Sequence, residues 1–231
     1  VLSEDYAAHL FLFENQFLVG EKMLIAEFHH YISPCIISTP NYTYEELLST
    51  MYQKVRYYKI NKKTQIRTLL REIFDQEQTE LILSYWSGEA TPVTPEEHFA
   101  QAILAVPAAE NALVQLSCAI YLFNSIENKI IKYDLDGEYL DETVFDFAKT
   151  GKKFQIITDA ERNSCFALVS NQGRASLKEI NPNSGEILRT IPIERHIFPQ
   201  KVAVRGDKIY YLSKDYFPAE GKLFLWKQNI D

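Results

Sequence analysis

Short apolar runs alternate with polar turn residues along most of the chain. The clearest unit has an apolar stretch at Ile120–Phe123, a polar turn at Asn124–Asn128 and a second stretch at Lys129–Tyr133. A tight turn follows at Asp134–Gly137, and a third stretch begins at Tyr139. Aspartate followed by glycine is a turn pair that hairpins prefer, because glycine adopts a positive φ without a Cβ clash. The pattern predicts antiparallel strands joined by tight turns.

The same strand–turn–strand unit occurs three more times. Copies lie at 55–70 and 175–191, and a shortened copy at 221–229 stops where its turn would begin. The junction between strand and turn falls at four positions with intervals of 73, 47 and 46 residues: Ile60, Tyr133, Ile180 and Trp226. A repeat of ~40–50 residues with several strands is typical of a β-propeller blade. The longer first interval predicts an insertion of roughly 27 residues in one blade.

Two segments carry helix signals instead. In the segment 94–106, Thr94 can cap a helix, Pro95 takes the first helical position and two glutamates follow in the first turn. In the segment 43–52, Glu-Glu-Leu-Leu follows the candidate caps Asn41 and Thr43. We expect two short helical insertions, one of them within 90–108. An alternating βαβ fold is disfavoured, because no helix follows most strand pairs.

These elements predict a mainly β chain: one propeller-like domain over residues 1–231, built from antiparallel four-stranded blades. The last copy of the repeat lacks its outermost strand, whereas the N-terminus has surplus strand material between His9 and Phe28. A propeller ring closes when a strand from one terminus completes the blade begun at the other, which removes an exposed sheet edge. We therefore predict that an N-terminal segment pairs with Leu223–Trp226.

One stretch of the chain matches a known blade motif. Asn124-Ser125, Asn128-Lys129-Ile130, Tyr133-Asp134 and Asp136-Gly137 occur in order. The stretch from 120 to 143 resembles a blade of the NHL-type six-bladed β-propellers. The resemblance implies the architecture of a propeller, which alone does not fix function. The chain is short for six blades with an insertion, so four or five blades, or part of a larger ring, are open alternatives.

Composition and charge narrow the function classes. The chain is 46% hydrophobic and 13% aromatic, enough for a real core and unlike a disordered sequence. It contains 24 Lys and Arg and 31 Asp and Glu, which gives a net charge of −7. This acidic balance argues against nucleic-acid binding as the main role. The longest mainly apolar run, Phe99–Val106, is far shorter than the ~20 residues of a membrane-spanning helix.

The start of the chain bears on its compartment. It begins at Val1 rather than methionine, which is compatible with a removed signal or with a lipid anchor outside this chain. We expect an extracytoplasmic setting, periplasmic or at the cell surface, with a cytoplasmic one as the alternative. Cys35, Cys118 and Cys165 are widely spaced and lie among apolar residues, so each is expected to be a small buried hydrophobe.

Catalytic and metal motifs do not emerge from the sequence. Nucleophile elbows, zinc-protease motifs, phosphate-binding loops and dinucleotide fingerprints are all missing from it. Asp134, Asp136 and Glu142 do not follow the order of a calcium loop, and a hairpin turn explains them better. No metal and no cofactor are therefore predicted.

Candidate contact residues lie in two loops. Arg195 and His196 fall in a crossing between blades, where propellers often expose loops near the channel mouth. Tyr216 and Phe217 lie in a loop that cannot easily bury two aromatic rings, and exposed aromatics beside charges are common in interfaces. We expect these four residues to bind a ligand or partner.

The function favoured by the sequence is a non-catalytic scaffold that presents loops to a protein or a small ligand. The alternative is a metal-dependent hydrolase of the lactonase type, because propeller-shaped lactonases place acids and asparagine around a central metal. Four residues could supply such a set: Asp159, Asn171, Asp207 and Asp215.

Overall fold

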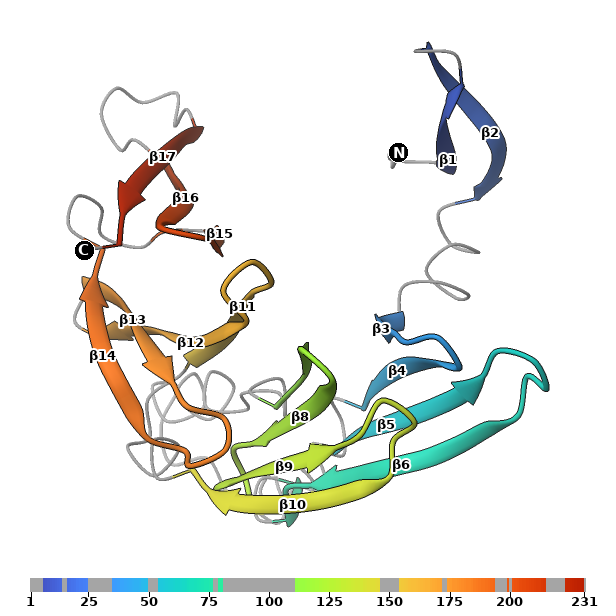
Figure 1. The fold of residues 1–231 in the computed structure, drawn as a ribbon, viewed down its shortest axis with the longest axis horizontal. Helices are drawn as coiled ribbons and strands as arrows, with labels where there is room; N and C mark the ends of the chain where they lie inside the picture. Colours follow the sequence, from blue (N-terminus) through green and yellow to red (C-terminus); the bar gives the residue numbers. More distant parts are fainter. Residues whose placement is uncertain are drawn as a thin grey trace, which may run out of the picture. The chain divides into compact units, whose positions relative to one another are not determined.

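The prediction of a mainly β, propeller-like chain is confirmed by the computed structural model, whose described residues form seventeen β-strands (Figure 1). The chain divides into two compact units: residues 1–47 with 56–71, and residues 48–55 with 72–231. Each unit is considered by itself, and the prediction of one domain stays a prediction. The structure describes residues 6–13, 16–24, 35–49, 54–76, 79–80, 111–145, 154–171, 174–193, 199, 201–214 and 223–230.

The first unit holds a hairpin and most of a four-stranded sheet. The hairpin pairs β1 (Tyr6–Phe13) with β2 (Gln16–Leu24) in antiparallel fashion. The sheet, called sheet B, has its strands in the order of the sequence, and the rings of Tyr44 and Tyr57 are fully buried. Its strands are β3 (Cys35–Ser38), β4 (Tyr42–Ser49), β5 (Lys54–Asn61) and β6 (Arg67–Phe74).

The helix expected over 43–52 is wrong, because Tyr42–Ser49 forms strand β4. The turn before it explains the error: Thr39 donates its amide to the carbonyl of Tyr42 at 2.9 Å, and its hydroxyl also bonds there. Asn41 therefore belongs to a hairpin turn with Pro40, not to a helix cap. Pairing with β3 and burial of Tyr44 override the helix propensity of Glu-Glu-Leu-Leu.

The second unit contains three consecutive antiparallel sheets, each with its strands in sequence order. Sheet C comprises β7 (Ala112–Leu116), β8 (Ala119–Asn124), β9 (Lys129–Tyr133) and β10 (Tyr139–Val144). Sheet D comprises β11 (Phe154–Asp159), β12 (Ser164–Asn171), β13 (Arg174–Ile180) and β14 (Ile187–Pro192). Sheet E comprises β15 (Lys201–Arg205), β16 (Lys208–Lys214) and β17 (Leu223–Asn229).

Sheet D is buried on both faces. One apolar cluster joins it to sheet C, with the ring of Phe145 in edge-on contact with Phe123 and Phe154 at 5.5 Å from each. A second cluster joins its other face to sheet E, where Leu177, Ile209 and Tyr211 are almost completely buried. Sheets stacked face to face in sequence order, with β7, β11 and β15 as neighbouring first strands, are the arrangement of propeller blades.

A shared turn links the third and fourth strands of sheets B, C and D. An Asn or Asp opens the turn, and its amide donates to the carbonyl of the residue just before the next strand, at 2.9–3.0 Å. The residue before that carbonyl has a positive φ: Gln65, Gly137 or Gly185. The opening residues are Asn61, Asp134 and Asn181, which confirms the junctions expected at Ile60, Tyr133 and Ile180.

The fourth junction falls two residues later than expected. The second residue of the second strand marks the same position in sheets C, D and E. Its partners in the third strand are Tyr133 for Ile120, Ile180 for Cys165 and Gln228 for Ile209. The junction therefore lies at Gln228–Asn229 rather than at Trp226. The expected position was wrong because residues 223–226 are apolar and aromatic like the strands of the earlier copies, and composition alone does not specify the register of a strand.

Other expectations have mixed outcomes. Cys165 is buried, and burial raises the pKa of its thiol to about 12, but Cys118 is exposed. The prediction for Cys118 is wrong because Ser117, with a φ of 51°, and Cys118 form a two-residue hairpin turn.

Three further expectations concern whole segments. The helix at 94–106 lies outside the described residues. The pairing of an N-terminal segment with Leu223–Trp226 joins the two units and stays a prediction. Among the described residues, no helix has the length and apolar character needed to span a membrane.

Candidate functional site

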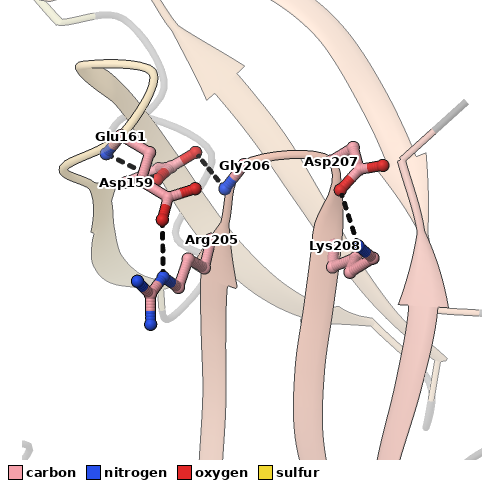
Figure 2. A network of polar contacts seen from close by, with 6 residues as sticks. All are labelled: Asp159, Glu161, Arg205, Gly206, Asp207 and Lys208. Atoms are coloured by element: carbon pink, nitrogen blue, oxygen red, sulfur yellow. Dashed lines mark hydrogen bonds and ion pairs between the residues drawn. The ribbon is translucent and has the colours of Figure 1, made fainter.

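A buried carboxylate lies where the turns of sheets D and E meet. Asp159, the last residue of β11, is only 1% exposed. One of its oxygens accepts the amide of Glu161 at 3.0 Å, and the other accepts the amide of Gly206 at 2.9 Å (Figure 2). Glu161 belongs to the β11–β12 turn and Gly206 to the β15–β16 turn. Asp159 therefore ties two consecutive sheets together.

Gly206 is suited to this contact by its backbone. Its φ is +59°, a left-handed conformation that favours glycine. A Cβ at this position would lie 2.9 Å from a carboxylate oxygen of Glu161. A side chain here would strain the turn and push the Glu161 carboxylate aside.

Two exposed ion pairs surround the buried carboxylate. The Nε of Arg205 lies 2.7 Å from a Glu161 oxygen, and this hydrogen bond raises the pKa of Arg205 above its ordinary value. The Nζ of Lys208 lies 3.3 Å from Asp207, and that contact lowers the pKa of the Asp207 carboxyl. Because these pairs are exposed, each contributes little to stability.

An open hollow of about 680 Å³ lies beside this network. Its wall is made by the end of β11 and by β15, with the half-buried ring of Tyr210 from β16. The volume is in the range of small-molecule sites. Eight residues line it: Thr158, Asp159, Ala160, Glu161, Ala203, Val204, Arg205 and Tyr210.

The hollow is continuous with one face of sheet E. Side chains alternate between the two faces of a strand. Val204, Ile209 and Tyr211 point to the face that packs on sheet D, so their neighbours in sequence point to the other face. That face is called the outer face of sheet E, and its cross-strand rows are Arg205–Lys208–Asn229, Ala203–Tyr210–Lys227 and Lys201–Leu212–Leu225.

The four contact residues expected from the sequence, Arg195, His196, Tyr216 and Phe217, lie outside the described residues, so their role stays a prediction. The structure instead places Arg205, Tyr210 and Leu225 around the hollow and on the outer face. The sequence could have indicated these positions through the alternation along 201–205 and 208–212. Every second residue there is apolar and buried or half-buried, so the residues between them lie on the opposite face. Which face is covered, however, depends on packing between sheets.

The residues considered for a lactonase set do not all converge. Asp159, at the end of β11, lies near the β15–β16 turn that contains Asp207. Asn171 is at the other end of β12 from the β11–β12 turn, seven residues from Ser164, which is roughly 20 Å along a strand. A single metal ion cannot bridge that separation. Asp215 lies outside the described residues.

The turn at Asp134 is a hairpin turn, as expected. One Asp134 oxygen accepts the amides of Asp136 and Glu138 at 2.9 and 2.8 Å. The carboxylate therefore orders its own turn. In the described ranges, no three or more histidine, cysteine, aspartate and glutamate side chains gather in an arrangement that could hold a metal ion.

Comparison with known proteins gives distant structural likenesses. No family model matches the chain, and no curated protein matches it in sequence. A candidate 6-phosphogluconolactonase from Bacteroides uniformis is 13% identical with a TM-score of 0.38, over 85% of this chain and 55% of that one. A luciferin-regenerating enzyme is 13% identical with a TM-score of 0.36, over 91% and 64%.

A third structure, a candidate 6-phosphogluconolactonase from Bacteroides fragilis, is 12% identical with a TM-score of 0.36, over 99% of this chain and 79% of that one. The chain thus spans 55% and 64% of the first two proteins. At such low identity the likeness concerns the fold and carries no function to this chain. The chain is a distant structural match of these propeller proteins.

Proposed function

We propose that this chain is a non-catalytic propeller scaffold that binds a protein or a small ligand. One observation carries the proposal: both oxygens of the buried Asp159 carboxylate accept backbone amides, one from each of two neighbouring turns. A carboxylate used in this way holds turns in place. It is poorly accessible as a general base or metal ligand, because Asp159 is only 1% exposed and each of its oxygens already accepts an amide.

The surroundings of Asp159 suit binding. The turns that it fixes hold Arg205 and Glu161 at the surface, where their side chains are 75% and 52% exposed. Tyr210 and Ala203 add an apolar wall to the same hollow. A rigid support with charged groups at its rim and apolar side chains between them is a common arrangement in binding sites.

The rival function is a lactonase-like hydrolase. Its supporting observation is that the hollow holds the Asp159 and Glu161 carboxylates at its wall. Elemental analysis of the purified chain, followed by hydrolysis assays on a panel of lactones with added calcium, magnesium, manganese and zinc, separates the two functions. We expect no stoichiometric metal and no hydrolysis above the buffer rate.

Asp159→Asn serves as the control variant in that assay. For a scaffold, the substitution changes stability and leaves the blank result unchanged. Metal-dependent hydrolysis by the wild-type chain that disappears in Asp159→Asn would overturn the proposed function and support the hydrolase.

A further inference from the structure

We draw no further inference here: the strongest candidate, the open hollow where the end of β11 lies beside β15, belongs to the candidate site already described, and nothing in the structure shows what covers the face of sheet E from which Arg205 and Tyr210 line it.

Discussion

Asp159 shows how a single buried carboxylate can serve structure. Its two oxygens accept the amides of Glu161 and Gly206, and its side chain is nearly inaccessible to solvent. Asp159→Ala leaves both amides without a partner, so we expect the free energy of unfolding in urea to fall by about 2–3 kcal/mol. Asp207→Ala, at an exposed position of the neighbouring turn, should change it much less. Similar losses in both variants would contradict a structural role for Asp159.

Glu46 in sheet B gives the first unit a dependence on pH. Burial raises the pKa of Glu46 above its ordinary value of 4.5, and the nearby Tyr57 hydroxyl offsets this rise only in part. The folded state thus holds this proton more tightly than the unfolded state. Its contribution to stability is present at pH below about 4.5 and is lost as the pH rises through the raised pKa.

Glu46→Gln removes this titration. We expect the variant to be more stable than the wild type near pH 7, with the difference shrinking toward pH 4, in urea unfolding at a series of pH values. Asp141→Asn, at an exposed site on β10, is the comparison and should keep the wild-type profile. The prediction is contradicted if the stability of the wild type rises between pH 5 and 7 by as much as the stability of Glu46→Gln rises.

At the scale of elements, one turn geometry recurs with different residues. Gly137 and Gly185 hold the left-handed position in sheets C and D, and Gln65 holds it in sheet B with a φ of 57°. A residue with a Cβ is strained in this region by ~1 kcal/mol. Gly185 has a second constraint, because a Cβ there would lie 2.1 Å from the carbonyl oxygen of Val144 at the end of β10.

Exchanging these residues should change stability in opposite directions. We expect Gln65→Gly to raise the free energy of unfolding by about 0.5–1 kcal/mol. Gly185→Ala should lower it by at least about 2 kcal/mol, because the strained φ and the contact with sheet C add together. Chemical denaturation of both variants measures this, and a neutral Gly185→Ala would mean that the turn does not touch sheet C.

The strands and their turns could be predicted from the sequence where local chemistry specifies them. Asp136-Gly137 and Ser184-Gly185 mark their turns by composition, and both were found there. Strand β4 could not be predicted in this way, because its Glu-Glu-Leu-Leu favours a helix when isolated and becomes a strand only through pairing with its neighbours. The register of β17 likewise depends on its pairing with β16.

At the scale of the molecule, the order of the sheets follows from the repeat interval, since each sheet closes within its own segment of the chain. Contacts between sheets do not follow from it. Asp159 and Gly206 are 47 positions apart, and no local pattern signals that they meet. The candidate site of the second unit therefore had to come from the structure.

The predicted closure of a ring belongs to this scale as well. In the described residues sheet E ends at β17, where an N-terminal strand would add a fourth strand along the edge. We expect Phe11→Cys or Leu24→Cys to form a disulfide with Phe224→Cys under mild oxidation, in a chain whose native cysteines are replaced by serine. Failure of every pair to cross-link, while Cys substitutions at the paired positions Leu212 and Leu225 do, would rule out the closure.

The exchange rate of the Gly206 amide hydrogen tests most directly whether Asp159 joins sheets D and E. Gly206 lies in a two-residue turn, where an amide without a partner exchanges almost as fast as in a free peptide. Bonded to the buried Asp159 carboxylate at 2.9 Å, it should exchange at least about 100-fold more slowly in native-state NMR measurements. Protection that disappears in Asp159→Ala is the predicted result. A Gly206 amide that exchanges without protection in the wild-type chain would contradict the account.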